Sequence, residues 1–190
     1  MKQGTESDLG EAYRRLAQFR SGATGDRLFV HPTPHPAGPT GFCYCEGSLR
    51  RAVSFHWKAL TLGIVLRLPS SRLKAWWLRR LGAAVEKGVY LSAGVWIDPM
   101  FPELLRIEEG VFLGMGTRIF THEFRVNEFR AGKVIIRRRA FVGGFSLIAC
   151  GVEIGEGAVV AACSVVDRDV PAGATLVAPP ARILKLRQPS

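Results

Sequence analysis

Residues 136–166 read IRRRAF VGGFSL IACGVE IGEGAV VAACSV V, with one aliphatic residue at the start of each group of six. Helical faces return about every 3.6 residues and strand faces about every 2, so a sustained period of six belongs to neither element alone. The period predicts a solenoid of short strands separated by turns, in which each repeat stacks on another. The aliphatic positions are Ile136, Val142, Ile148, Ile154, Val160 and Val166.

The same period extends upstream in two shorter runs, and two insertions interrupt it. The steps between the runs are ten and seventeen residues long instead of six. A solenoid needs no such loops for stability, and irregular segments on a regular scaffold are where binding and catalysis tend to lie. His122, the only histidine of the repeat region, lies in the second insertion. The two upstream runs are Val85, Leu91, Ile97 and Ile107, Leu113, Ile119.

The composition bounds the class of protein and its partners. The chain has 190 residues, of which 47% are hydrophobic and 22% charged, a balance typical of a globular domain. Its net charge of +10 favours anionic partners. No zinc finger, aromatic RNA-binding signature or compact basic arm accompanies this charge, so nucleic acid is not an expected partner. The polar N-terminus is no signal peptide, and a reduced, cytoplasmic protein is expected.

The four cysteines do not form a metal-binding pattern. Cys43 and Cys45 are separated by one residue, not by the two of a zinc knuckle, and no second pair follows. Their role stays open, and no metal is expected. Cys150 and Cys163 fall in the hexad region and are expected to be buried small apolar residues.

Residues 1–82 are expected to form a helical and loop extension. The pattern predicts helices over residues 8–20, over residues 49–68, and from a cap at Ser70 or Ser71 to Leu81, where Gly82 is a natural terminator. Residues 21–48 are predicted to be a loop of open function, because residues 31–41 contain four prolines and two glycines. The expected apolar faces are Val53, Trp57, Leu60, Ile64 in the second helix and Leu73, Trp76, Trp77, Leu81 in the third.

These two apolar faces need a partner. We expect them to pack on the first turn of the solenoid, whose strand edges would otherwise be exposed. The alternative is docking of residues 50–80 on a membrane surface, at the inner face of the cell membrane, which the arginine and lysine residues of this segment would help.

The second half of the chain resembles the hexapeptide-repeat acyltransferase superfamily. Residues 142–147, 154–159 and 160–165 match its repeat, and residues 166–171 (VDRDVP) with 180–182 (PAR) are similar to its terminal signature. The superfamily includes maltose, galactoside and polysaccharide O-acetyltransferases. The resemblance covers residues 85–185. It implies a mainly β fold, with a left-handed parallel β-helix and C-terminal tail over residues 83–190, a homotrimer, and acetyl-CoA as the acyl donor.

The resemblance also implies three hexads per coil, which make a triangular prism. Eighteen residues per coil place Ile136 over Ile154, and the other aliphatic positions stack in the same way at the strand spacing of about 4.8 Å. Both insertions then follow the third face of a coil, so they emerge from the same corner, one coil apart. Glu108 and Arg137 depart from the pattern, since the family often has glycine at these positions.

In the resembling acetyltransferases a loop at this stage carries the catalytic histidine, and His122 is the matching position. A hydroxyl is a poor nucleophile at neutral pH, and neutral imidazole is well suited to remove its proton. The alternative is a hydrogen-bonded loop histidine without chemistry. Asp98 lies on the coil next to His122 and is expected to orient the imidazole, stabilise the imidazolium or bind an acceptor hydroxyl, or only to cap a turn. Glu123 is a further catalytic candidate.

The donor-binding residues are implied by the resemblance. The backbone N–H of Gly144 matches the group that stabilises the tetrahedral intermediate. Ala162 stands one coil further on and matches a backbone contact to the pantetheine arm. Arg168, Arg182 and Lys185 match positions where the family uses basic residues near the phosphates of CoA.

These features predict an acetyl-CoA-dependent O-acetyltransferase that acts on a hydroxyl of a sugar, polysaccharide or related small molecule, with His122 as general base. A γ-type carbonic anhydrase uses the same prism but needs three histidine ligands from the repeats, and only His122 is present. N-acylation of an amino sugar or nucleotide-sugar is an alternative, and a non-catalytic β-helix scaffold is another. The acceptor, the acyl chain length and the role of Arg137, Arg138 and Arg139 stay open.

Overall fold

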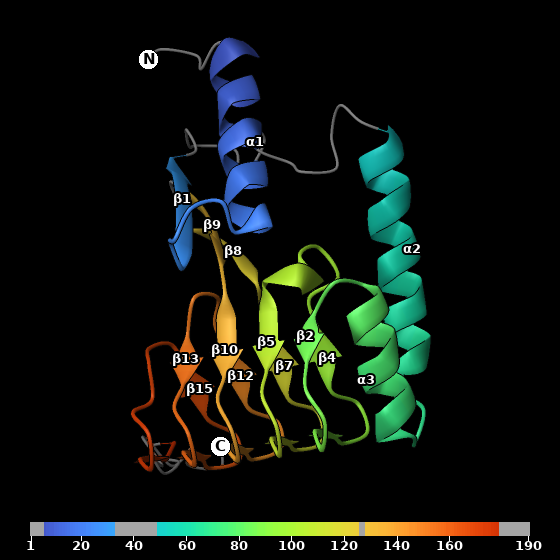
Figure 1. Ribbon diagram of the computed structural model, residues 1–190, viewed down its shortest axis with the longest axis vertical. Helices are drawn as coiled ribbons and strands as arrows, with labels where there is room; N and C mark the ends of the chain where they lie inside the picture. Colours follow the sequence, from blue (N-terminus) through green and yellow to red (C-terminus); the bar gives the residue numbers. More distant parts are fainter. Residues whose placement is uncertain (1–5, 33–48, 126–127, 179–190) are drawn as a thin grey trace, which may run out of the picture.

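The computed structural model describes residues 6–32, 49–125 and 128–178, and a three-sided parallel solenoid forms its centre (Figure 1). Each face is one parallel sheet, with one strand from each successive coil. The first face contains β2 (Ala84–Val85), β5 (Leu105–Ile107), β10 (Val134–Ile136) and β13 (Glu153–Ile154). The second contains β3 (Tyr90–Leu91), β6 (Phe112–Leu113), β11 (Phe141–Val142), β14 (Val159–Val160) and β16 (Thr175–Leu176). The third contains β4 (Trp96–Ile97), β7 (Arg118–Ile119), β12 (Leu147–Ile148) and β15 (Val165–Val166).

The aliphatic positions of the six-residue period fill the interior of the prism, as predicted. Ile136 pairs with Ile154, and both side chains are fully buried. The same relation joins Val142 to Val160 on the second face. Burial of one such side chain stabilises the fold by about 1.5–3 kcal/mol, so the stacked layers hold the coils together without any help from the insertions.

The turns between faces use the left-handed backbone region at one fixed position. Glycine fills it at Gly157, with φ of 63°, where the absence of a Cβ makes this conformation easy. Phe145 and Cys163 occupy the same position with φ of 58° and 60°. Cys163 is therefore exposed on a corner, so the prediction that it is buried was wrong. Cys150 is partly buried.

The two insertions leave the prism at the same corner, after β4 and after β7. The first contains the short 3₁₀ helix η1 (Pro102–Leu104), and the second forms a hairpin of β8 (His122–Arg125) and β9 (Glu128–Gly132). The N-terminal strand β1 (Leu28–Pro32) pairs antiparallel with β9. The prediction that residues 21–48 contain only loop was therefore wrong for residues 28–32, and residues 33–48, with Cys43 and Cys45, lie outside the described residues.

Helix α1 (Glu6–Ser21) packs on these insertions and creates a second apolar core away from the prism. Figure 1 shows α1 beside β1 and the β8–β9 hairpin, beyond the end of the solenoid strands. Sequence alone did not indicate that the N-terminal segment supports the insertion corner. The buried members of this second core are Ala12, Leu16, Phe19, Phe29, Phe101, Leu104, Phe129 and Ala131.

Helices α2 (Leu49–Val65) and α3 (Ser71–Arg80) form as predicted, but they do not present most of the predicted faces to the solenoid. Ser70 caps α3 by accepting a hydrogen bond from the N–H of Leu73, and Gly82 ends it with φ of 104°. The residues of α3 that are buried are Lys74, Ala75 and Leu78. The predicted packing faces were therefore wrong for six of their eight residues, which are exposed: Val53, Trp57, Leu60, Ile64, Leu73 and Trp76. The other two, Trp77 and Leu81, are partly buried and pack against the core as predicted.

Two polar residues of α3, Ser71 and Lys74, turn toward the first coil and bind backbone groups there. The Nζ of Lys74 donates to the carbonyl oxygens of Leu91 and Ser92 at 3.0 and 2.8 Å. The hydroxyl of Ser71 accepts from the N–H of Leu91 and donates to the carbonyl of Val89. An exposed strand edge needs such partners, so α3 closes the first coil with hydrogen bonds as well as with apolar contacts. The division into a helical extension, residues 1–82, and a solenoid domain stays a prediction.

Candidate active site at the insertion corner

The two insertions bring Asp98 and His122 together, from successive coils. The imidazole Nδ1 of His122 contacts the Oδ2 atom of Asp98 in a hydrogen bond. The Asp98 side chain is 1% exposed and that of His122 is 18% exposed. The contact predicted from stacking is therefore present, and a nearly buried carboxylate holds an imidazole that solvent still reaches.

Asp98 also organises the backbone of both insertions. Its Oδ2 atom accepts from the N–H and the hydroxyl of Thr121, and from the N–H of His122 at 3.2 Å. Its Oδ1 atom accepts from the N–H of Met100 at 2.9 Å. Burial by itself would raise the pKa of Asp98, but the hydrogen bond and charge of His122 with the other donors outweigh burial and lower it. Asp98 therefore stays ionised, and it both caps the turns and contacts the imidazole.

Three phenylalanine rings surround the imidazole of His122. The rings of Phe101 and Phe124 meet it edge to face, with centroids 5.9 and 5.8 Å away. Phe129 lies 6.1 Å away in a tilted arrangement. Because Phe101 and Phe129 are fully buried members of the second core, helix α1 and strand β1 indirectly fix the imidazole. The alternation of Phe129 and Ala131 with polar residues is a signal that could have predicted β9, but nothing in the sequence linked that segment to β1.

This arrangement assigns different tasks to the two ring nitrogens of His122. An ionised Asp98 can only accept, so Nδ1 carries the proton of their hydrogen bond. The neutral imidazole then has its lone pair on Nε2. An imidazole in this tautomer can take a proton at Nε2, and the neighbouring carboxylate stabilises the imidazolium that forms.

The structure does not bring Glu123 into the Asp98–His122 pair. Neighbouring side chains of a strand point to opposite sides, and Glu123 follows His122 in β8. Its Oε1 atom accepts from the Nε of Arg125 at 2.8 Å and lies 3.9 Å from Arg130. Glu123 is thus part of a partly exposed ion-pair group on the hairpin.

Gly144 and Ala162 lie at another corner of the prism from His122. Both follow the second face, whereas the insertions follow the third. The corner is narrow, because a Cβ added to Gly143 would lie 2.4 Å from the backbone N of Ala162, and one added to Gly144 would lie 2.9 Å from a carbonyl oxygen. Only residues without a bulky side chain therefore fit between the coils at this corner, and within one chain the corner lies apart from the imidazole.

Of the three basic residues expected near CoA, the structure describes Arg168. Arg168 follows the third face, so it shares the insertion corner with His122, and its 78% exposed side chain pairs with Asp167 at 2.9 Å. The mutual hydrogen bond lowers the pKa of Asp167 and raises that of Arg168. Arg182 and Lys185 lie outside the described residues.

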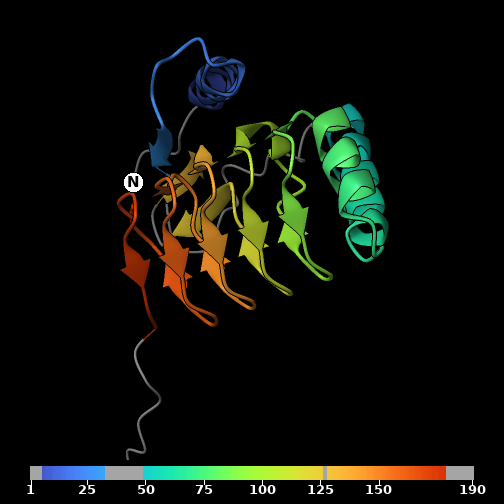
Figure 2. The same cartoon turned by 60° about the horizontal axis from the view of Figure 1, so that its bottom comes forward.

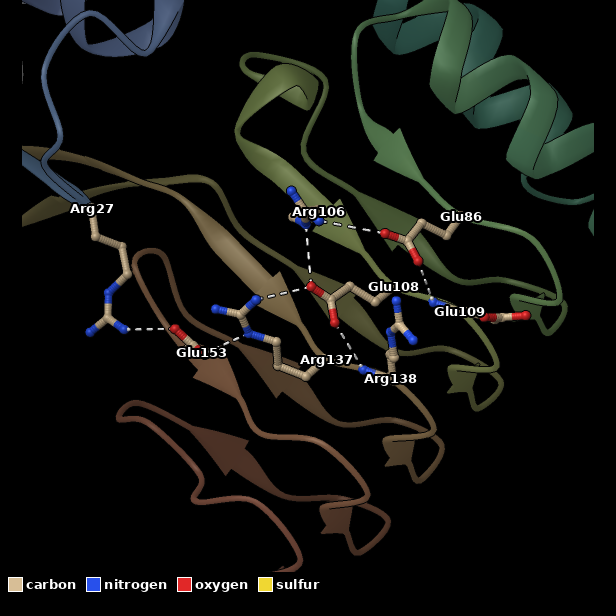
Figure 3. A network of polar contacts seen from close by, with 8 residues as sticks. All are labelled: Arg27, Glu86, Arg106, Glu108, Glu109, Arg137, Arg138 and Glu153. Carbon is tan, nitrogen blue, oxygen red and sulfur yellow. Dashed lines mark hydrogen bonds and ion pairs between the residues drawn. The ribbon is translucent and has the colours of Figure 1, made fainter.

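Arg137 has a structural role on the first face, where charged side chains from successive coils form a ladder (Figure 3). It donates to Glu108 at 2.9 Å and to Glu153 at 2.7 Å. Glu108 also accepts from the backbone N–H of Arg138 and contacts Arg106 at 3.3 Å. Burial alone would raise the pKa of Glu108, but the Arg137 hydrogen bond and the neighbouring cations lower it. Glu108 and Arg137, which stand where the family often has glycine, therefore link successive coils through ion pairs.

The other candidate nucleophiles and bases of the described residues show no comparable environment. Burial raises the pKa of the Cys150 thiol to about 12, so it is protonated at neutral pH and is a poor nucleophile. His56 lies on α2, with Nδ1 2.7 Å from the carbonyl oxygen of Ala52. His31 lies in β1, where burial and Arg15 lower its pKa. No group of three potential metal ligands occurs within residues 6–32, 49–125 and 128–178.

Comparison with known proteins agrees with this fold. No protein-family model matches the chain. The putative acetyltransferase YvoF of Bacillus subtilis is 36% identical over 114 residues, which are 59% of this chain and 66% of YvoF, slightly less than two thirds of that relative. The maltose O-acetyltransferase of Clostridium difficile 630 superposes with a TM-score of 0.55 and 19% identity, over 75% of this chain and 90% of the other. The hexapeptide-repeat acetyltransferase VCA0836 of Vibrio cholerae, complexed with acetyl coenzyme A, gives 0.53 and 21% over 74% and 91%.

The solenoid is thus the left-handed β-helix that the resemblance implied. The chain is similar to hexapeptide-repeat acetyltransferases in fold, and to the putative acetyltransferase YvoF in sequence, as the resemblance of residues 85–185 indicated.

Proposed function

We propose that this protein is an acetyl-CoA-dependent O-acetyltransferase acting on a hydroxyl of a sugar, a polysaccharide or a related small molecule. The observation that carries the proposal is the Asp98–His122 pair, a buried carboxylate and an accessible imidazole at the corner where both insertions emerge. The similarity to a maltose O-acetyltransferase and to an acetyltransferase with bound acetyl coenzyme A supports the donor and the class of acceptor.

The proposed reaction is direct transfer. Nε2 of His122 removes the proton of the acceptor hydroxyl while its oxygen attacks the thioester carbonyl. The carbonyl π bond opens to give a tetrahedral oxyanion. When the carbonyl re-forms, the carbon–sulfur bond breaks, and the departing thiolate takes the proton back from the imidazolium. The Asp98 carboxylate stabilises the cation in between, and the acetyl ester and CoA are released.

The proposed donor site needs a second protomer. Gly144 supplies the N–H for the oxyanion, and Ala162 lies beside the pantetheine arm on the same corner. Because that corner is not the one that carries His122, one chain cannot provide both groups for one thioester. We therefore infer a homotrimer, in which the insertion corner of one protomer faces the small-residue corner of the next. Arg168, Arg182 and Lys185 would then contact the phosphates of CoA.

Release of free thiol from acetyl-CoA tests the proposal. The wild-type protein should release thiol only in the presence of an acceptor, and a panel of neutral sugars, oligosaccharides and amino sugars identifies it. His122→Ala should abolish release, and His56→Ala is the matched control because His56 bonds only within its own helix. Turnover of amino sugars alone would favour N-acylation. Equal turnover by the wild type and His122→Ala would contradict the proposal.

A further inference from the structure

Helix α2 carries a continuous apolar stripe that no part of the described chain covers. Val53, Trp57 and Leu60 are each 59% exposed, and Ile64 is 57% exposed. Their spacing of three or four residues places them on one side of the helix, with Leu49 at its start. Leu62, on a different side, is the buried residue of α2. The helix is therefore attached to the solenoid by a narrow contact, while its wider apolar side faces outward.

Further exposed apolar residues follow in the turn after α2 and on α3. Leu68, Leu73 and Trp76 are 37%, 39% and 45% exposed. Figures 1 and 2 show α2 and α3 side by side, covering the end of the prism next to β2. In Figure 1, α2 extends past the upper ends of the neighbouring solenoid strands. We call Leu49, Val53, Trp57, Leu60, Ile64, Leu68, Leu73 and Trp76 the outer apolar face. It is too large to be a scatter of single exposed residues.

The charges around the outer apolar face all have the same sign. Residues 49–82 contain eight arginine and lysine residues and no aspartate or glutamate. Arg50, Arg67, Arg72 and Arg80 are exposed, and the guanidinium of Arg80 lies 5.2 Å from the ring centroid of Trp76. Apolar side chains that include tryptophan, with arginine and lysine around them, are the composition of helices that lie in the headgroup region of a membrane.

A second copy of the same face is a poor partner for it. Across a self-complementary contact the arginines would meet one another, and no acidic residue of the segment would offset the repulsion. Crossing of the bilayer is not involved, since no helix within the described ranges is long and apolar enough to span it. An anionic lipid surface offers an apolar region for the exposed apolar side chains and negatively charged headgroups for the arginine and lysine residues.

We propose that the outer apolar face docks this protein on an anionic phospholipid surface. Helix α2 lies in the plane of the headgroups with Trp57 and Leu60 inserted, and the arginines contact lipid phosphates. Docking brings the active site to acceptors held at the membrane surface.

Sedimentation with vesicles tests the proposal on the full-length protein. The wild type should bind vesicles of phosphatidylcholine with 30% phosphatidylglycerol at least tenfold more strongly than pure phosphatidylcholine, and bound lipids with brominated chains should quench tryptophan fluorescence. Trp57→Ser/Leu60→Ser/Ile64→Ser should lose at least tenfold in binding. Arg72→Gln/Arg80→Gln should weaken it by about fivefold for each charge at low salt.

The control variant is Val165→Ser/Val177→Ser, whose side chains are 64% and 68% exposed on the solenoid, and it should bind as the wild type does. Circular dichroism and light scattering on every variant separate lost docking from misfolding. Equal partition of wild type and triple variant onto anionic vesicles would overturn the proposal. Absence of vesicle binding by the wild type would also overturn it. If the oligomer of the triple variant dissociated in addition, the result would show that a second chain covers the outer apolar face.

Discussion

Acidic and basic side chains meet across successive coils both on the first face and at the insertion corner, and the two regions differ in what these groups can do. On the first face Glu108 lies between Arg106 and Arg137, and the guanidiniums are 53% and 38% exposed. At the insertion corner Asp98 is 1% exposed and faces the imidazole of His122. Guanidinium is protonated at every relevant pH, whereas imidazole can gain and lose a proton near neutrality.

The difference shows that charge in the repeat region is not by itself a sign of function. The ladder replaces glycine with ion pairs that tie the coils together. At the corner, the imidazole of His122 lies among aromatic rings, is still reached by solvent, and keeps Nε2 available for a substrate proton. Substitutions in the two regions should therefore separate activity from stability.

The largest effect should come from His122→Ala. Removal of the proposed general base should lower acetyl transfer by about 10²–10⁴-fold, because the acceptor hydroxyl then loses its proton only to water. The rate of acceptor-dependent thiol release measures this loss, and unchanged thermal unfolding shows that the fold is kept. A rate within a few-fold of the wild type would place the site elsewhere.

Asp98→Asn should lower the rate less, by about 10²-fold, since a neutral amide no longer stabilises the imidazolium and fixes its tautomer less firmly. A positioning role predicts that kcat falls while KM for acetyl-CoA hardly changes, because the donor does not touch Asp98. A change confined to KM would instead assign Asp98 to acceptor or donor binding.

The same carboxylate should make stability depend on pH. The pKa of Asp98 is lower in the folded protein than its ordinary value of about 3.9, so the unfolded state binds the proton more readily. Its contribution is complete above about pH 4 and is lost as pH falls through the lower folded pKa. Urea unfolding of the wild type and Asp98→Asn between pH 3 and 7 should show a difference that shrinks at the acidic end. A constant difference would contradict the assignment.

Glu108→Gln should affect stability and leave activity alone. The side chain is 10% exposed and contacts two guanidiniums, so loss of its charge leaves them without their shared partner at a cost of about 1–3 kcal/mol. Chemical denaturation measures the cost, and thiol release should stay at the wild-type rate. A large loss of rate at normal stability would mean that the first face takes part in catalysis.

Glu123→Gln should have the smallest effect. Its ion pair with Arg125 joins side chains that are 28% and 53% exposed, and such pairs contribute less than about 1 kcal/mol. The expected rate is close to that of the wild type. A strong decrease, with the fold intact, would restore Glu123 as a catalytic candidate.

The sequence predicted the solenoid and the Asp98–His122 contact because both depend on spacing. Every sixth residue must be aliphatic to fill the prism, and positions eighteen apart must stack. With the three hexads per coil that the resemblance implied, Asp98 and the second insertion follow the third face of successive coils, and their proximity followed from counting. The exposure of Cys163 was harder to predict. Cys163 occupies the turn position of its hexad, the fourth, in the left-handed conformation that glycine adopts at the same position elsewhere.

The N-terminal segment was harder to predict because its partners are distant in sequence. Strand β1 is short, ends in Pro32, and pairs with residues about a hundred positions away. The faces of α2 and α3 were assigned by hydrophobicity, but the open coil required donors. Lys74 therefore faces inward, and Trp57 and Trp76 face outward. Pattern rules count apolar residues and overlook what an open sheet edge demands.

A crystal structure with CoA and an acceptor tests the central claim most directly. We expect the sulfur of CoA to lie at the insertion corner, within hydrogen-bond reach of an acceptor hydroxyl that contacts Nε2 of His122, with Gly144 of another protomer beside the thioester. CoA bound along the charged first face, or an imidazole that neither substrate approaches, would contradict it.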